Sequence, residues 1–217
     1  MATKKQKYAT ILADPPWDID QKGTYGAINH YNLMTLDCIK AMPVADFAED
    51  NSHCWLWCTN GTLRHGYDVL EAWGFTPRSV FTWVKNRLGM GNYLRLSSEY
   101  IIFATRGKAP VLFKGQPNWG FFPVQDHSHK PEEQYAIIER VSPGPYLELF
   151  ARQRQPGWDV WGNEIDSDVN IPGYPVPSYS AKAKQKIKKE LKMNEFQRYY
   201  DDFSSKRSAC DYGRQDC

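Results

Sequence analysis

Short apolar runs alternate with polar segments through the first 166 residues. The runs at 8–12, 53–58, 79–85, 99–105, 146–151 and 158–161 are rich in β-branched and aromatic residues, which is typical of strands. The run 53–58 is too apolar to face water on either side. We therefore predict a sheet whose strands are buried on both faces.

Between these runs, apolar residues recur at three- and four-residue spacing, which predicts helices. Thr35 is placed to N-cap a short helix that ends near Pro43. A second helix carries Leu63, Tyr67 and Leu70 and is closed by Gly74. A third has Pro131 at its expected first position, acids at 132 and 133, and runs through Tyr135, Ile138 and Val141 to the break at 142–145.

Strands alternating with helices predict an α/β fold with a parallel-rich sheet and helices on both faces. In such sheets ligands bind at the carboxyl ends of the strands. The chain has no G-x-G-x-x-G fingerprint, so a classical dinucleotide enzyme is disfavoured. We expect one domain over residues 1–166, followed by a different segment over 167–217.

Two polar stretches interrupt the pattern. Residues 18–32 contain glycines and Tyr25, and a loop of this length beside Asp14 favours a lid over a plain insert. We expect Tyr25 among the substrate-binding residues. Residues 86–97 read as a loop whose cations, Arg87 and Arg95, could meet phosphates.

The segment 167–217 begins with a proline-rich linker at 171–177. Six lysines then crowd residues 182–192, and Met193, Phe196, Tyr200 and Phe203 follow at helical spacing. This pattern predicts a basic, partly amphipathic helix. It fits a nucleic-acid contact, docking on a partner or on its own domain, or a solvated helix with no role.

Composition narrows the class of protein. The chain has 217 residues, 41% of them hydrophobic, and a net charge of only +2, so it is not a generic polyanion binder. We find no signal peptide and no apolar stretch of membrane length, and expect a cytoplasmic protein with reduced thiols and no membrane contact. Its five cysteines form no C-x-x-C pair, and neither His53 beside Cys54 and Cys58 nor the pair His127 and His129 has the spacing of a metal site, so we expect no metal.

The first apolar run ends in Asp14-Pro15-Pro16-Trp17. Consecutive prolines stiffen the loop and remove two N–H donors, so we expect their carbonyls to remain free to accept hydrogen bonds. Asp14 and the Pro15 carbonyl could together accept the two protons of a nucleobase amine, while Trp17 or a nearby aromatic stacks on the ring. The plainer alternative is a proline-rich turn in which Asp14 only caps.

This D-P-P-W motif after a short strand resembles the adenine-N6 methyltransferases related to the seventy-kilodalton catalytic subunit of mRNA adenosine methyltransferase. The family also has bacterial and phage members thought to act on DNA. The likeness extends over roughly residues 8–166 through motifs in the family's order: W-L-W at 55–57, W-G-F at 73–75, W-V-K at 83–85, E-Y at 99–100, S-H-K-P-E-E at 128–133, E-R-V-S-P-G at 139–144, E-L-F-A-R at 148–152 and W-G-N-E at 161–164. It does not cover the basic tail.

The resemblance implies a Rossmann-like methyltransferase fold with permuted motif order, a catalytic domain over 1–166 and S-adenosylmethionine as cofactor. It implies that Lys130 meets the methionine carboxylate, that Phe150 and Arg152 line the adenosine side, and that Asn163 and Glu164 bind ribose or adenine edges. An ammonium suits a carboxylate, and an amide or carboxylate suits hydroxyls. A surface lysine and a structural ion pair are the plainer alternatives for Lys130 and Arg152.

Glu99 corresponds to a family acid near the target adenosine, with a buried structural acid as the alternative. The chain departs from the eukaryotic subunit twice. Gln153-Arg154-Gln155 replaces a longer segment with a His-Asn pair, and Glu164 stands where an amide is found. Cofactor contacts around both positions are therefore in doubt.

The reaction that these residues imply is direct, in-line transfer of a methyl group to adenine N6, without a metal or a covalent intermediate. Positioning of the amine supplies most of the rate, and a base in duplex DNA must first be flipped out of the stack. The compact chain favours DNA, while RNA adenosine, cytosine N4, or a catalytically silent nucleic-acid-binding partner subunit stays open. A homodimer or a partner subunit is compatible with the sequence.

Overall fold

The computed structural model describes residues 6–18, 33–89, 93–125, 129–163 and 165–174. Within these ranges the chain forms a seven-stranded sheet in the order β5-β3-β4-β2-β1-β6-β7. Its strands are β1 (Tyr8–Ala13), β2 (Ala48–Cys58), β3 (Thr76–Gly89), β4 (Leu96–Arg106), β5 (Trp119–Phe121), β6 (Tyr146–Leu149) and β7 (Trp158–Trp161). The helices are α1 (Leu36–Lys40), α2 (Leu63–Ala72), α3 (Glu133–Val141) and the short 3₁₀ helix η2 (Val44–Asp46).

One strand runs against the others in this part of the chain. β1 pairs in parallel with β2 and β6, β6 with β7, and β3 with β5. β4 pairs antiparallel with both β2 and β3, so β4 alone among the seven is reversed. The parallel-rich α/β fold is confirmed as a Rossmann-like sheet of mixed direction. Six strands therefore end at the same edge, where β4 begins.

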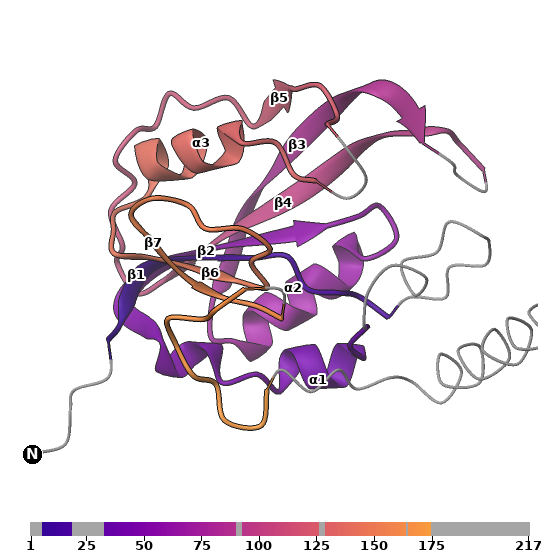
Figure 1. Cartoon of the computed structure of the whole chain (residues 1–217). Coiled ribbons are helices and arrows are strands. Elements are labelled where there is room, and N and C mark those ends of the chain that lie inside the picture. Colours follow the sequence, from indigo (N-terminus) through magenta and orange to yellow (C-terminus); the bar gives the residue numbers. More distant parts are fainter. Residues whose placement is uncertain (1–5, 19–32, 90–92, 126–128, 164, 175–217) are drawn as a thin grey trace, which may run out of the picture.

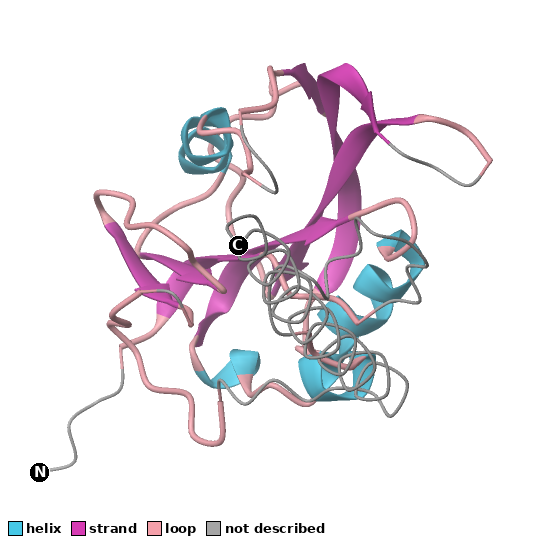
Figure 2. Cartoon of the chain, turned by 45° about the vertical axis from the view of Figure 1, so that its right-hand side comes forward, coloured by secondary structure: helices cyan, strands magenta, loops and turns pink. Residues whose placement is uncertain are grey.

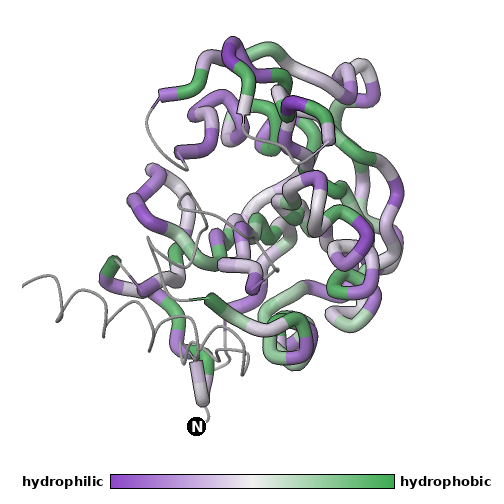
Figure 3. The backbone as a smooth tube through the Cα atoms, turned by 90° about the vertical axis from the view of Figure 1, so that its right-hand side faces the viewer, coloured by the Kyte–Doolittle hydropathy of each residue, from purple (hydrophilic) through white to green (hydrophobic). Residues whose placement is uncertain are grey.

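Helices cover both faces of the sheet, as expected, with α3 on one face and α1 and α2 on the other (Figures 1 and 2). Side chains of β2 alternate between two hydrophobic clusters: Cys54 and Leu56 pack with α2, and Trp55 and Trp57 pack with α3. Figure 3, which colours the backbone by hydropathy, shows hydrophobic segments alternating with hydrophilic ones along the chain. This two-sided burial explains why the run 53–58 is continuously apolar.

Local sequence signals predicted the ends of two helices correctly and that of a third incorrectly. The Thr35 side chain accepts a hydrogen bond from the Cys38 amide and caps α1, and Gly74, with φ +81°, follows α2. The third helix begins at Glu133 with Glu132 as N-cap, so Pro131 is not its first residue. The Pro131 carbonyl instead accepts from the Gln134 amide (3.1 Å) in a turn that precedes the helix.

The prediction of a loop over 86–97 is wrong in extent, because strand residues occupy both of its ends. β3 continues to Gly89 and β4 starts at Leu96, and the two strands extend beyond the rest of the sheet as a long hairpin (Figures 1 and 2). The three-residue edge strand β5 was not predicted. Tyr25 and the rest of the expected lid, residue 164, and the tail from 175 onward lie outside the described residues.

Candidate active site at the carboxyl edge of the sheet

Asp14 follows β1, in the centre of the edge where six strands end. The loop behind it is fixed at both prolines: the Pro15 carbonyl accepts from the Trp17 amide (2.9 Å) and the Pro16 carbonyl from the Met34 amide (2.8 Å). We expected these carbonyls to be free, and each is already an acceptor. A carbonyl has two lone pairs, so the Pro15 oxygen retains the capacity for a second hydrogen bond.

Trp17 is part of the core beneath this loop. Its side chain is buried, packs in the cluster beside α2, and donates from Nε1 to the Trp57 carbonyl (3.2 Å). The expectation that Trp17 offers a stacking face is therefore not supported, because the indole is enclosed by the sheet. Its contribution is to tie the D-P-P-W loop to the end of β2.

Lys130 reaches Asp14 from the segment before α3. Its Nζ lies 2.7 Å from Asp14 Oδ2 and 3.5 Å from Glu99 Oε2, and 5.1 Å from the centre of the Trp57 ring. The side chains of Lys130 and Asp14 are 16% and 33% exposed, so this is a partly buried ion pair. The structure thus brings Asp14, Glu99 and Lys130, which lie far apart in the sequence, to one place.

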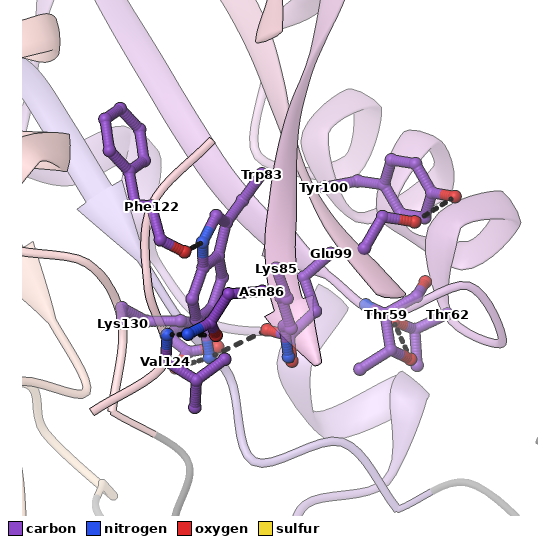
Figure 4. A network of polar contacts seen from close by, with 12 residues as sticks. Thr59, Thr62, Trp83, Lys85, Asn86, Glu99, Tyr100, Phe122, Val124 and Lys130 are labelled. Atoms are coloured by element: carbon purple, nitrogen blue, oxygen red, sulfur yellow. Dashed lines mark hydrogen bonds and ion pairs between the residues drawn. The ribbon is translucent and has the colours of Figure 1, made fainter. Parts of the chain in front are cut away.

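Glu99 has a second cation, Lys85 of β3, as an ion-pair partner (Figure 4). Burial alone would raise the pKa of Glu99, but the charges of Lys130 and Lys85 and their hydrogen bonds outweigh it and hold the pKa below its ordinary value. Glu99 is therefore an ionised acceptor at neutral pH. Asp14, Lys130, Glu99 and Lys85 form an alternating series of charges along the sheet edge.

A buried acid lies next to this series on β6. Glu148 is 9% exposed and accepts a hydrogen bond from the Tyr135 hydroxyl of α3 (2.9 Å). Burial raises the pKa of Glu148 to about 7; the Tyr135 hydrogen bond acts in the opposite direction, and the nearby Asp14 charge raises the pKa further. Sequence reasoning missed this pair, although the acid in the E-L-F-A-R motif was a visible signal.

The loops after β6 and β7 lie against each other at the same edge. Phe150 has a positive φ of 66°, rare for a side chain with a Cβ, and its ring packs edge-on against Trp161. The Ala151 amide donates to the Trp161 carbonyl (2.9 Å), and a side chain at Gly162 would collide with the Ala151 carbonyl oxygen. These contacts bring the exposed residues Arg152 and Asn163 to the edge that holds Asp14.

The predicted phosphate-binding residues lie further from Asp14. Arg87 and Arg95 are exposed on the β3–β4 hairpin, which extends past the carboxyl edge of the sheet. Arg154, in the segment that departs from the family pattern, donates to both Asp168 carboxylate oxygens (3.0 and 3.1 Å). Arg154 thus serves a structural ion pair.

Sequence reasoning also missed Lys85 and the two tryptophan rings that lie beneath Lys85 and Lys130. Trp57 and Trp83 meet edge to face at 5.9 Å, and Lys85 lies over the Trp83 ring at 4.5 Å. The signal was present in the strand pattern, because Lys85 has the same parity as Trp83 and therefore points to the same face of β3. Only the pairing of β3 with β4 shows that Glu99 lies there too.

The described residues contain no cluster suited to a metal ion. No three His, Cys, Asp or Glu side chains there are grouped so that they could hold a metal ion. His53 lies near the start of the buried part of β2 and shares a hydrogen bond of 2.8 Å with the Ser142 hydroxyl, away from Cys58 at the strand's end. No helix in the described residues is both long and apolar enough to span a membrane.

Comparison with known proteins gives a consistent picture. A family model described as MT-A70 matches residues 8–164. An N(6)-adenosine-methyltransferase MT-A70-like protein of Drosophila melanogaster is 34% identical in a 172-residue alignment that covers 74% of this chain and 27% of that protein. The human N(6)-adenosine-methyltransferase catalytic subunit METTL3 is 32% identical, with 74% and 28% covered.

A relative of similar length also matches. The type II methyltransferase M.MunI of a Mycoplasma species is 28% identical in an alignment of 195 positions that covers 77% of this chain and 82% of that protein. The chain therefore spans only about a quarter of the length of the N(6)-adenosine methyltransferases it matches, but most of the type II methyltransferase.

Proposed function

The chain belongs to the MT-A70 family, and from that premise we propose that it transfers a methyl group from S-adenosylmethionine to N6 of adenine in DNA. The observation that carries the proposal is the position of Asp14, on a fixed loop at the carboxyl edge and paired with Lys130. The presence of a type II methyltransferase among its relatives supports DNA as the first candidate substrate.

The residues at the edge suit the proposed cofactor. Lys130 would hold its carboxylate, Phe150 and Arg152 would line its adenosine, and Asn163 and Glu164 would meet ribose or adenine edges. Support comes from the strained backbone at Phe150 and the close approach at Gly162, two features that tend to occur where a ligand site constrains the chain. When bound, the cofactor supplies an electrophilic methyl group on a sulfonium.

The chain's own task is to orient a weak nucleophile. The Asp14 carboxylate accepts one N–H of the adenine amine and the Pro15 carbonyl accepts the other, which aims the nitrogen at the methyl group. The cofactor would supply the methyl group and its sulfur would keep the electrons of the broken C–S bond, so that the methylated amine would carry one proton too many. The Asp14 carboxylate is placed to receive it. Fixed dipoles and charges of this kind commonly contribute several kcal/mol.

The hairpin side of the sheet supports a nucleic-acid substrate. Between Thr76 and Gln125 the sequence has seven Lys or Arg and a single acid, in a chain whose net charge is +2. Large exposed apolar side chains gather in the same part, including Tyr93 at 100% exposed and Trp119 at 59%. Positive charge interleaved with exposed aromatics is the pattern by which proteins hold single strands and splayed-out bases. Arg87 and Arg95 would then meet phosphates.

RNA adenosine is the second candidate substrate, because the Drosophila and human relatives are named as N(6)-adenosine methyltransferases. Cytosine N4 presents the same amine geometry and is the third. A catalytically silent partner subunit is disfavoured, since such a protein has no need to keep Asp14 paired with Lys130 in a partly buried site.

The test is transfer of labelled methyl groups to DNA and RNA oligonucleotides by the purified chain, followed by digestion to nucleosides. We expect N6-methyladenine, mainly in DNA. Asp14→Ala should lower transfer by at least about 100-fold while cofactor affinity stays similar, and Asp14→Asn should keep part of the activity because an amide oxygen still accepts.

The matched control is Asp68→Ala, which removes an exposed acid on α2. Near-normal transfer by Asp14→Ala would show that Asp14 does not hold the amine. Absence of transfer by the wild-type chain to every oligonucleotide, with cofactor bound, would favour the silent partner subunit.

A further inference from the structure

Lys85 is a charged residue at the candidate site to which the reaction described above gives no role. Its Nζ is bonded to Glu99 Oε1, while Lys130 approaches the other oxygen of the same carboxylate at 3.5 Å. Glu99 and Lys85 are 22% and 20% exposed. Figure 4 shows the two lysines reaching Glu99 from different segments, β3 and the segment before α3.

The distances around Lys130 indicate what Lys85 does. Lys130 lies closer to Asp14 (2.7 Å) than to Glu99 (3.5 Å), although both are carboxylates. Glu99 is already neutralised by Lys85, so its pull on Lys130 is weakened. With Lys85 removed, Lys130 would be the only cation paired with Glu99 among the described residues, and it would be drawn from Asp14 toward β4.

Lys85 is itself held in place. Its ammonium lies 4.5 Å from the centre of the Trp83 ring, and Trp83 Nε1 donates to the Phe122 carbonyl (2.8 Å). The adjacent Asn86 side chain accepts from the Val124 amide (3.1 Å), which ties this end of β3 to the segment after β5. A cation fixed in this way can set the position of its partner.

We propose that Lys85 is a positioning residue for methyl transfer, which acts through Glu99 to keep Lys130 bonded to Asp14. The inference rests on the proposed function and adds a residue to it. Lys85 and Lys130 pair with the two oxygens of the same Glu99 carboxylate, so Lys85 can act on Lys130 through that carboxylate. A direct phosphate contact is the competing role for a lysine near the basic hairpin.

The first experiment is a double-mutant cycle on single-turnover transfer. Lys85→Met keeps the aliphatic stem over Trp83 and removes the charge. We expect about a tenfold or greater loss in rate and, because Lys130 is also assigned to the cofactor carboxylate, weaker cofactor binding, with a melting temperature close to wild type. In a Glu99→Gln background the same change should cost less than about twofold, because the route through the carboxylate is gone. An equal loss in both backgrounds would overturn the proposal.

The second experiment reads the charge of Glu99 directly. Titration of its carboxyl carbon by NMR should show a higher pKa in Lys85→Met than in wild type, because an opposite charge has been lost. Lys85→Arg, which keeps the charge, should restore both the titration and most of the rate. The two acids are distinguished by their ranges, because the pKa of Glu99 is held below its ordinary value whereas that of Glu148 is raised to about 7.

The salt dependence of DNA binding separates positioning from phosphate contact. Loss of one phosphate contact lowers the slope of log affinity against log salt by about 0.9 on a duplex, whereas a positioning residue leaves it unchanged. A lowered slope with an unshifted Glu99 titration would overturn the proposal. The NMR titration needs no turnover, so a chain inactive on every substrate would refute the proposed function and still leave Lys85 testable.

Discussion

Glu148 is an acid in an environment that disfavours its charged form. It is buried between β6 and α3 with the Tyr135 hydroxyl as donor, and its pKa is raised from an ordinary 4.5 to about 7. A folded-state pKa above the unfolded value means that the protonated form is preferred in the fold. This contribution to stability is full below about pH 4.5 and is lost as the pH rises through about 7.

We therefore predict that Glu148→Gln flattens the pH dependence of stability. Between pH 5 and pH 8 the wild-type chain should lose on the order of 2 kcal/mol of unfolding free energy relative to the variant, because Gln accepts the Tyr135 hydrogen bond and does not ionise. Urea unfolding at several pH values measures the difference. Glu133→Gln, which replaces an exposed acid on α3, the helix that carries Tyr135, is the control and should run parallel to wild type.

Single residues were predictable from sequence where their role is local. Thr35 caps α1 as expected, because the capping hydrogen bond spans only three residues. The partners of Asp14 and Glu99 were not predictable from spacing, since Lys130 lies 116 residues from Asp14 and Lys85 meets Glu99 only through strand pairing. The burial of Trp17 likewise depends on Trp57, a residue of another strand.

At the scale of elements, the loops after β6 and β7 are the part least tolerant of change. The backbone of Gly162 lies so close to the Ala151 carbonyl that an added methyl group has no room. We predict that Gly162→Ala costs about 1–3 kcal/mol of stability and weakens cofactor binding, because the two loops must separate. Chemical unfolding and calorimetric titration with S-adenosylmethionine measure the two effects.

The neighbouring Asn163→Ala is the matched control for this loop. Asn163 is exposed, so its removal should leave the unfolding free energy within about 0.5 kcal/mol of wild type and act on cofactor affinity alone. Equal stability of Gly162→Ala and Asn163→Ala would show that the two loops part without cost.

The buried parts of the strands were predicted from sequence, and the exposed parts were not. β1, β2, β6 and β7 are apolar enough to be recognised, because they are buried on both faces. The ends of β3 and β4 extend past the core as an exposed hairpin, so their residues are polar and lack the buried-strand signal. The edge strand β5 has three residues, with Gly120 between two exposed aromatics, and its only sheet neighbour is β3.

At the scale of the whole molecule, alternation of strands and helices predicted the fold class but not the order of strands in the sheet. The reversal of β4 follows from the hairpin with β3, and its consequence is functional. It places the start of β4, with Glu99, at the edge where the other strands end. Strand order depends on which surfaces pack together, and no local pattern in one sequence encodes it.

The basic tail raises the last question at this scale, which is whether it belongs to the catalytic body. Sequence placed the boundary at residue 166, but Ile171 is buried in the core and the Tyr174 hydroxyl donates to the Cys38 carbonyl (3.1 Å). A cut intended to remove only the tail therefore belongs after Tyr174. It leaves both contacts intact and removes the six lysines between 182 and 192.

We predict that the chain cut after Tyr174 keeps its cofactor affinity and melting temperature but binds DNA more weakly and with a smaller salt slope. Each phosphate contact contributes about 0.9 to that slope on a duplex, so the loss of three or four contacts is readily measured. Replacement of the six lysines by glutamine in the full chain is the control and should reproduce the reduced slope. A lower melting temperature with an unchanged slope would instead show that Met193, Phe196, Tyr200 and Phe203 pack against the catalytic body or a second copy of the chain.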